Sequence, residues 1–184
     1  MRVVAGEWRG HRLAAPAGAS TRPTADRVRE ALFSILGSVE GLTVLDLFAG
    51  SGALGIEALS RGAAAATFAD SSSAALKAVR GNIERLGVDA SRGHVVRSDW
   101  RAFLRKAAAR GERWDLVFCD PPYRLAHRLA KDLGDALAPV LAPQARVVSE
   151  SSARQPLRLD LPLLTERRYG DTLVAVHASE EQAA

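Results

Sequence analysis

The sequence predicts an α/β fold, in which a mostly parallel seven-stranded sheet is covered by helices on both faces. Two observations lead to this prediction. From Leu42 onward, short apolar runs alternate with segments whose apolar residues recur at helical spacing. The apolar runs are continuous and do not alternate with polar residues, which is typical of strands buried on both faces of a parallel sheet.

Five apolar runs are the expected parallel strands. They lie at residues 44–48, 65–69, 95–97, 116–119 and 146–149. Helices are expected between them, at residues 54–60, 73–86, 102–110 and 125–137. Two further strands, 163–169 and 172–177, flank Gly170-Asp171 and are expected to form a hairpin that adds one antiparallel strand.

The N-terminal part differs in pattern from the rest of the chain. Residues 2–13 are expected to form a small hairpin around Gly6–Gly10, followed by a loop at 14–21 and a helix from Asp26 to about Gly37. We therefore divide the chain into an N-terminal extension, a main domain and a frayed tail. Their expected ranges are 1–20, 21–178 and 179–184.

Length and composition limit the class of protein. The chain has 184 residues, of which 47% are hydrophobic, enough for one well-buried core. It has no apolar run of transmembrane length, and because its first residues lack an apolar stretch with a cleavage site, secretion is not expected. Its single cysteine, Cys119, rules out an internal disulfide and is expected to be a small buried side chain. The four histidines are scattered, so no metal site is expected. We expect a cytoplasmic protein, a monomer without a membrane partner.

The charge is mildly basic, with a formal net charge of +4 and a pI of about 9.8. Much of the excess lies in residues 1–25, which contain four basic residues, Arg2, Arg9, Arg12 and Arg22, and one acidic residue, Glu7. A basic surface permits a polyanionic partner such as nucleic acid without proving one.

Acidic side chains recur at the ends of four successive expected strands. These are Asp46, Asp70, Asp99 and Asp120. Ligands of open parallel sheets bind outside the carboxyl ends of the strands, so these carboxylates are candidates for one shared cleft. The alternative is that each is a helix N-cap or a turn residue.

A glycine-rich loop follows the first strand. Gly50, Gly52 and Gly55 form the pattern G-x-G-x-x-G, and Asp70 follows twenty residues after Gly50, as in dinucleotide-binding proteins. The glycines are expected to let the backbone approach a cofactor. An NAD enzyme is thus a real alternative, but Asp46 would repel a pyrophosphate, whereas the cationic S-adenosylmethionine tolerates carboxylates. The chain after the loop is also short for a separate substrate domain.

The tetrapeptide Asp120-Pro121-Pro122-Tyr123 follows the fourth strand. Two prolines make a stiff loop whose carbonyl groups accept hydrogen bonds. An exocyclic amine on a base is a poor nucleophile with two N–H donors on a planar ring. Asp120 and the carbonyl of Pro121 are candidates to accept from the two N–H groups, and Tyr123 to stack on the ring. Catalysis would then consist mainly of positioning. The alternative is an ordinary proline turn that ends a strand.

These motifs together resemble a known family. The Asp-Pro-Pro-Tyr tetrapeptide after Asp46-Leu-Phe-Ala-Gly-Ser-Gly52 is similar to the amino-methyltransferases of the class I, Rossmann-like fold. Three features resemble the bacterial 16S ribosomal RNA guanine-N2 methyltransferases. They are Arg2-Val-Val-Ala-Gly6 with Arg9-Gly-His-Arg-Leu13, the run Thr21-Arg-Pro-Thr-Ala-Asp-Arg-Val-Arg-Glu-Ala-Leu-Phe33, and the same Asp46–Gly52 loop. The tetrapeptide and Tyr169-Gly-Asp-Thr172 agree as well, and the match covers nearly the whole chain. One departure is Asp70, where relatives often have glutamate.

The resemblance implies that S-adenosylmethionine is the cofactor and that the target is a guanine of 16S ribosomal RNA, at nucleotide 966. The residues implied to cradle the methionine part are Asp46, Phe48, Ala49, Gly50, Ser51 and Gly52. Asp70 and Ser71 would hold the ribose, and Asp99 the adenine amino group, with Trp100 near the ring. For Trp100 the alternative is packing at a helix start.

The implied partner is 16S ribosomal RNA or the small ribosomal subunit. The candidate RNA contacts are Arg2, Arg9, Arg12, Arg22, Arg27, Arg29, Arg124 and Arg128. For these arginines the alternative is a solvated basic face.

Two other functions remain open on the motifs alone. One is an amino-methyltransferase for adenine N6 in DNA or for glutamine in a protein; the other is an NAD-binding oxidoreductase or a non-catalytic nucleotide-binding module.

Overall fold

A computed structural model describes residues 1–16, 26–121 and 123–179, without the side chains of 123–128. The chain divides into two compact units, Met1–Ser98 and Asp99–Ala184, and each is described by itself. The seven strands are assigned to one sheet. The first unit contributes β3-β2-β1 and the second β4-β5-β7-β6, in that order.

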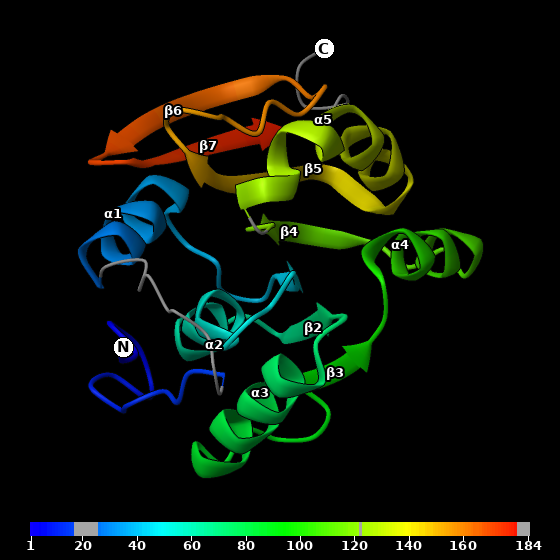
Figure 1. The fold of residues 1–184 in the computed structure, drawn as a ribbon. Coiled ribbons are helices and arrows are strands. Elements are labelled where there is room, and N and C mark those ends of the chain that lie inside the picture. The colour runs from blue at the N-terminus through cyan, green and yellow to red at the C-terminus, as the bar shows by residue number, and fades with distance from the viewer. Residues whose placement is uncertain (17–25, 122, 180–184) are drawn as a thin grey trace. The chain divides into compact units, whose positions relative to one another are not determined.

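The first unit alternates helices and parallel strands (Figure 1). Its elements are α1 (Asp26–Leu36), β1 (Thr43–Leu47), α2 (Ala53–Ser60), β2 (Ala65–Asp70), α3 (Ser73–Arg85) and β3 (Gly93–Arg97). β1 and β3 each pair with β2 in parallel. α2 packs against β1 and β2, and α3 against β2 and β3. All residues of α2 from Leu54 to Ser60 are buried, so this short helix is part of the core.

The second unit carries the antiparallel end of the sheet. Its elements are α4 (Trp100–Ala109), β4 (Trp114–Cys119), α5 (Tyr123–Leu137), the 3₁₀ turn η1 (Ala138–Val140), β5 (Leu141–Ser152), β6 (Leu163–Tyr169) and β7 (Thr172–Ala178). β4 and β5 are parallel, and β7 runs antiparallel to both β5 and β6. The predicted terminal hairpin is therefore confirmed, with β7 as the one reversed strand.

Several elements are longer than predicted, and for two of them the partners explain why. β5 was expected at residues 146–149 but covers Leu141–Ser152, because Leu141 already pairs with Trp114 and the strand continues against β7 as far as Ser152. α4 was expected to begin at residue 102 but begins at Trp100, because Asp99 caps it. Pairing and capping partners thus set boundaries that hydrophobic pattern alone misses.

Two kinds of feature are absent from the residues that the structure describes. None of the helices in residues 1–16, 26–121 and 123–179 has the length and apolar character needed to cross a membrane. In the same ranges, His, Cys, Asp and Glu side chains form no group of three or more suited to a metal ion.

Candidate functional site

The loop after β1 makes a strained turn that β2 holds in place. The backbone N–H groups of Phe48 and Ala49 both donate to the carbonyl of Ala69, at 3.0 and 3.1 Å. Phe48 has φ of 72°, a left-handed conformation that costs a non-glycine residue on the order of 1–3 kcal/mol. The turn closes with a 2.7 Å hydrogen bond from Gly52 to the carbonyl of Ala49. We call residues 48–52 the glycine loop.

Asp70, at the end of β2, supports the same loop. Its Oδ2 accepts a hydrogen bond from the backbone N–H of Gly50 at 3.0 Å. Its Oδ1 accepts from the N–H of Ser72 at 2.8 Å, and Ser72 in turn caps α3. Asp70 is therefore a turn residue, which was the alternative given for it from the sequence. It also holds the glycine loop in place.

Asp46 lies beneath the loop and is 3% exposed. Its Oδ2 accepts a hydrogen bond from the N–H of Gly55 in the first turn of α2, at 2.9 Å. Burial raises the pKa of the Asp46 carboxyl to about 7, the Gly55 hydrogen bond opposes this, and the negative charge of Asp70 adds to it. A nearby cation would therefore favour the ionised form of Asp46.

The three glycines of the motif have different roles. A Cβ on Gly50 would meet little, its nearest heavy atom being the carbonyl oxygen of Phe48 at 3.9 Å. A Cβ on Gly52 would lie 3.2 Å from Phe68, and one on Gly55 only 2.4 Å from it. The expectation that the glycines make room for a cofactor therefore fits Gly50 alone. Gly52 and Gly55 make room for the buried ring of Phe68 between α2 and β2.

The other predicted cofactor residues lie at helix starts or on the surface. Asp99 caps α4, since its carboxylate accepts from the N–H groups of Arg101 and Ala102 at 3.0 and 3.4 Å. Trp100 is 8% exposed, and the guanidinium of Arg101 lies 4.4 Å from its ring centroid. Ser71 is exposed. The cap and the packing that we gave as alternatives are thus present for Asp99 and Trp100, and their contacts with an adenine remain predictions.

The tetrapeptide follows β4 in the second unit. Asp120 is half-buried and Pro121 is buried, directly after Cys119, which is buried as expected. Pro122 and the side chain of Tyr123 lie outside the described residues. The catalytic roles predicted for the tetrapeptide therefore remain predictions.

Residues 1–16, called here the N-terminal segment, turn back on themselves as predicted. Arg2 and Arg12 form one antiparallel bridge, and Val3 donates to His11 at 3.0 Å while Leu13 donates to Met1 at 3.1 Å. The pairing stops at that single bridge, so the segment is shorter in strand than expected. Its side chains of Val3, Trp8 and Leu13 are buried.

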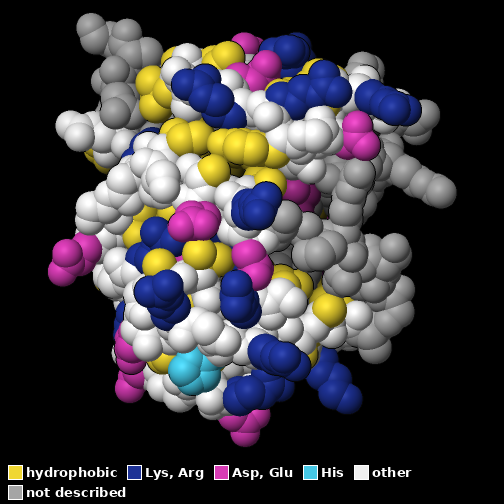
Figure 2. Space-filling view, turned by 90° about the vertical axis from the view of Figure 1, so that its left-hand side faces the viewer, with side chains coloured by type: hydrophobic (Ala, Val, Ile, Leu, Met, Phe, Trp, Pro, Cys, Tyr) yellow, Lys and Arg dark blue, Asp and Glu magenta, His cyan; other side chains and the backbone are white. Residues whose placement is uncertain are grey.

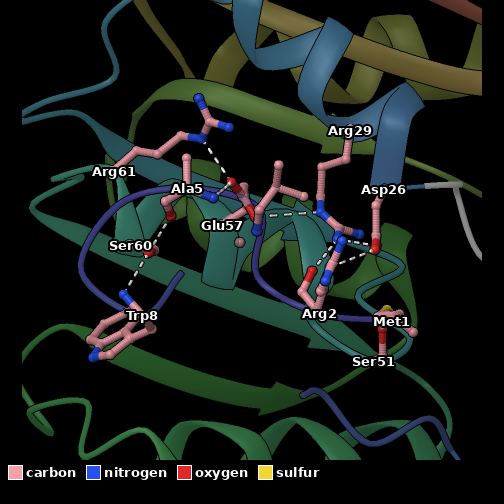
Figure 3. Close-up of polar contacts among 12 residues, drawn as sticks. Met1, Arg2, Ala5, Trp8, Asp26, Arg29, Ser51, Glu57, Ser60 and Arg61 are labelled. Atoms are coloured by element: carbon pink, nitrogen blue, oxygen red, sulfur yellow. Dashed lines mark hydrogen bonds and ion pairs between the residues drawn. The ribbon is translucent and has the colours of Figure 1, made fainter. Parts of the chain in front are cut away.

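A buried carboxylate fastens this segment to the first unit (Figure 3). Glu57, in the middle of α2, is 0% exposed and accepts from the N–H groups of Val4 and Ala5 at 2.7 and 3.0 Å. It also forms ion pairs with Arg29 at 3.4 Å and Arg61 at 2.8 Å. Every oxygen of the carboxylate is thereby engaged, as a buried charge requires.

Arg29 was predicted as an RNA contact, and that prediction is wrong. Its side chain is 0% exposed, so no phosphate can reach it. It donates to the carbonyl of Arg2, pairs with Asp26 at 2.9 Å, and faces Glu57 (Figure 3). The helical periodicity of α1 was the available signal, because Arg29 lies three, four and seven residues before the buried Leu32, Phe33 and Leu36 and so shares their face.

Ser60 and Gly6 form a second attachment. The hydroxyl of Ser60 donates to the carbonyl of Ala5 at 2.6 Å and accepts from the N–H of Trp8 at 3.0 Å. The carbonyl of Ser60 accepts from Glu7 at 2.8 Å. A Cβ on Gly6 would lie 1.8 Å from that carbonyl oxygen, and φ of 85° also favours glycine there. The segment therefore crosses α2 at backbone contact.

The segment also reaches the glycine loop. Asn82 of α3, which is fully buried, binds both the N–H and the carbonyl of Ala14 and donates to the carbonyl of Ser51. The hydroxyl of Ser51 lies 3.4 Å from the sulfur of Met1 (Figure 3). Sequence reasoning missed both Glu57 and Asn82. Each is a polar residue inside a helix whose neighbours are apolar, which was the available signal.

The remaining RNA candidates vary in their surroundings. Arg9, Arg12 and Arg27 are exposed, and Arg2 is 66% exposed although it pairs with Asp26 at 3.2 Å. A hollow of about 370 Å³ is lined by Met1, Arg2, Arg12, Leu13 and Asp26. Figure 2 shows Lys and Arg side chains spread over one face of the molecule, with acidic side chains among them. Arg22 and the side chains of Arg124 and Arg128 lie outside the described residues.

Comparison with known proteins places this arrangement in a family. Residues 1–178 match the family described as Conserved hypothetical protein 95. The chain belongs to this family. Ribosomal RNA small subunit methyltransferase D of Escherichia coli K12 is 44% identical over 125 residues, 67% of this chain and 61% of that protein. Its namesake from Haemophilus influenzae is 33% identical over 160 residues, 85% of this chain and 81% of that protein. The family predicted from the motifs is therefore confirmed.

Solved structures agree on the fold. A hypothetical protein of Thermus thermophilus is 31% identical with a TM-score of 0.80, covering 96% of this chain and 98% of that one. A SAM-dependent methyltransferase from Agrobacterium tumefaciens is 20% identical with a TM-score of 0.66, covering 87% and 63% of the two chains. The second likeness concerns the fold alone. The predicted class I methyltransferase fold is confirmed.

Proposed function

We propose that the chain transfers a methyl group from S-adenosylmethionine to the exocyclic N2 amine of a guanine in 16S ribosomal RNA. By the resemblance of its N-terminal motifs, the target is the guanine at nucleotide 966. Relatives 44% and 33% identical to the chain carry the name Ribosomal RNA small subunit methyltransferase D, which supports the proposal. The chain matches 61% of the length of the first of these, so activity and partner are both part of the proposal.

The observation that carries the choice of cofactor is the pair of acids at the glycine loop. Asp46 is buried beneath the loop with a pKa raised to about 7, and Asp70 contributes to that rise. A pyrophosphate would add negative charge beside them, whereas the sulfonium and ammonium groups of S-adenosylmethionine would neutralise it. The open space at Gly50 leaves the backbone accessible to such a ligand.

Within this proposal each predicted residue has a role in binding. Asp46 and the backbone of the glycine loop hold the methionine part, Asp70 and Ser71 the ribose hydroxyls, and Asp99 the adenine amino group beside Trp100. The residues of the loop concerned are Phe48, Ala49, Gly50, Ser51 and Gly52. Asp70 keeps its bond to Gly50 while it does so, because a carboxylate oxygen accepts more than one hydrogen bond.

The tetrapeptide orients the nucleophile. The cofactor, when bound, supplies an electrophilic methyl group on a positively charged sulfur. Asp120 and the carbonyl of Pro121 accept from the two N–H groups of the guanine amine and direct its nitrogen. Pro122 stiffens the loop, and Tyr123 stacks on the base. A base that is unpaired or flipped out of its helix is the form that such a loop can hold.

RNA binding is proposed for seven arginines, four of which are described and exposed in the first unit. Arg2, Arg9 and Arg12 of the N-terminal segment and Arg27 of α1 are the described candidates, and Arg22, Arg124 and Arg128 are the others. Contacts of this kind with phosphates position the RNA and do not read its sequence. The proposed partner is the small ribosomal subunit or its RNA, bound by a monomer of this chain.

The deciding experiment is a methylation assay with identification of the modified base. Purified protein and labelled S-adenosylmethionine are incubated with small ribosomal subunits that lack the modification, and the RNA is digested to nucleosides. The proposal predicts label in N2-methylguanosine at one position, and no label with Asp120→Ala. Duplex DNA and a release-factor protein are parallel substrates. Label in either of them, and none in the ribosomal RNA, would replace this function with one of the alternatives.

A further inference from the structure

Asn82 joins the N-terminal segment to the glycine loop. Its side chain is 0% exposed, yet it lies inside α3, where asparagine is a poor helix former. Oδ1 accepts from the N–H of Ala14 at 2.8 Å and from Arg85 at 3.2 Å. Nδ2 donates to the carbonyls of Ala14 and Ser51, both at 3.0 Å. The amide thus uses all four of its hydrogen-bonding positions, three of them on these two elements.

A second contact links the same two elements. The hydroxyl of Ser51 lies 3.4 Å from the sulfur of Met1, and the N–H of Leu13 donates to the carbonyl of Met1 at 3.1 Å. Both ends of the hairpin formed by the segment therefore meet Ser51 of the glycine loop, one directly and one through Asn82. Displacing the segment would leave a buried amide without two of its partners, which is costly.

We propose that Asn82 is a positioning residue that couples the glycine loop to the N-terminal segment, so that RNA binding and cofactor binding strengthen each other. This inference rests on the proposed function. RNA contacts through Arg9 and Arg12 favour the position of the N-terminal segment seen here, in which it contacts Asn82 and Ser51. Because these contacts hold the glycine loop in one conformation, the loop is then ready to bind the cofactor. Because such coupling is reciprocal, the cofactor also tightens RNA binding by the same factor.

The test measures the affinity for a cofactor product in the absence and in the presence of RNA. The dissociation constant for labelled S-adenosylhomocysteine is measured by equilibrium dialysis, without and with unmethylated small ribosomal subunits. For the wild-type chain the subunits are expected to lower it by about 5-fold or more, within the usual range of coupling between sites. Asn82→Asp keeps the shape of the side chain and the acceptor Oδ1, but turns an oxygen toward two carbonyls. This variant is expected to bind S-adenosylhomocysteine more weakly without RNA. The ratio of its dissociation constants without and with subunits is expected to be close to 1.

Two matched variants separate coupling from loss of structure. Ser60→Ala removes another attachment of the segment, to Ala5 and Trp8, without touching the loop, and is expected to leave affinity without RNA unchanged. If Asn82→Asp does not fold by circular dichroism, Ala14→Pro replaces it. That change removes the N–H group that donates a hydrogen bond to Asn82, at an exposed position outside the helices. Ala15→Pro, at the next exposed position, is its control and is expected to behave like the wild type.

The outcomes are distinct. An unchanged affinity and an unchanged ratio in Asn82→Asp, or in Ala14→Pro where that variant replaces it, would overturn the coupling and leave the proposed function standing. A similar loss of affinity without RNA in Ser60→Ala would assign the effect to general loosening of the segment and would also overturn it. A wild-type chain that does not bind S-adenosylhomocysteine would overturn both proposals together. A ratio that collapses in the Asn82→Asp or Ala14→Pro variant alone would support the coupling.

Discussion

The carboxylate of Asp70 accepts a 3.0 Å hydrogen bond from the backbone N–H of Gly50, twenty residues earlier in the chain. Its other oxygen closes the turn into α3 at Ser72. The acid at the end of β2 therefore shapes the loop after β1 before any ligand arrives.

Replacing Asp70 with Ala should impair cofactor binding more than folding. The variant loses the support of the glycine loop together with the proposed contact to the ribose, so the dissociation constant for S-adenosylhomocysteine should rise at least 10-fold. Isothermal titration calorimetry measures it. Asp89→Ala is the control, because Asp89 closes a similar turn with Ser91 away from the loop. Equal effects of the two variants would remove Asp70 from the binding site.

Asp46 should make both stability and cofactor binding depend on pH. Its pKa is about 7 in the folded chain and 3.8 in the unfolded reference, so the folded state holds the proton more tightly between these values. The free energy of unfolding of the cofactor-free chain should therefore fall as pH rises from about 4 to 7. Since one pKa unit corresponds to about 1.4 kcal/mol, the contribution is on the order of a few kcal/mol. Urea unfolding at several pH values measures it.

The variant Asp46→Asn separates the two effects. It should be more stable than the wild type at pH 8, because no buried charge remains, and it should bind S-adenosylhomocysteine more weakly. Binding by the wild type should improve as pH rises through 7, since a cationic ligand favours the carboxylate. Parallel pH profiles of unfolding in the variant and the wild type would show that Asp46 does not titrate in this range.

Gly55→Ala should destabilise the first unit without touching any ligand group. The added Cβ would lie 2.4 Å from the ring of Phe68, and forcing an extra methyl group into a packed core costs about 1–3 kcal/mol. Gly81→Ala is the control in another helix of the unit, because its Cβ meets no atom within 4 Å. That change should stabilise the chain by about 0.5–1 kcal/mol. Urea unfolding curves of both variants give the comparison, and a neutral Gly55→Ala would contradict the packing role.

Glu57→Gln should be strongly destabilising. The neutral amide removes the buried one of the two carboxylates that pair with the fully buried Arg29, and breaking one partner of a buried ion pair costs about 3–5 kcal/mol. The exposed pair of Glu7 and Arg92, 3.6 Å apart, supplies the control Glu7→Gln, for which about 1 kcal/mol or less is expected. Chemical unfolding measures both. A small effect of Glu57→Gln would mean that Asp26 and the carbonyl of Arg2 are enough to compensate the buried charge of Arg29.

Arg9→Ala and Arg12→Ala should weaken RNA binding in a salt-dependent way. Each phosphate contact adds about 0.7–0.9 to the slope of log affinity against log salt, so the double variant should flatten that slope by between 1 and 2. Fluorescence anisotropy with a 16S ribosomal RNA fragment at several salt concentrations measures it. Arg110→Ala, at a position 71% exposed in the second unit, is the control. An unaltered slope would leave these arginines as a solvated face.

The sequence allowed the layered fold and the glycine loop to be predicted, because buried strands and the G-x-G-x-x-G spacing are local patterns. The buried Glu57, Asn82 and Arg29 could not be placed in this way. Each is a polar residue with partners 27 to 68 residues away in the chain as well as one nearby, so only the folded chain reveals how its charge or amide is paired. Arginine in a basic stretch predicts exposure on average, and Arg29 is buried because a carboxylate on another helix compensates it.

Most of the hydrogen bonds that fasten the N-terminal segment end on its main chain. Glu57 holds the N–H groups of Val4 and Ala5, Ser60 binds the carbonyl of Ala5 and the N–H of Trp8, and Asn82 binds the peptide groups of Ala14. Main-chain atoms are present whatever the side chain. Substitutions outside the three buried apolar positions, Gly6 and the contacting side chains of Met1, Arg2 and Glu7 would therefore alter the surface that this stretch presents while its course over the first unit stays the same.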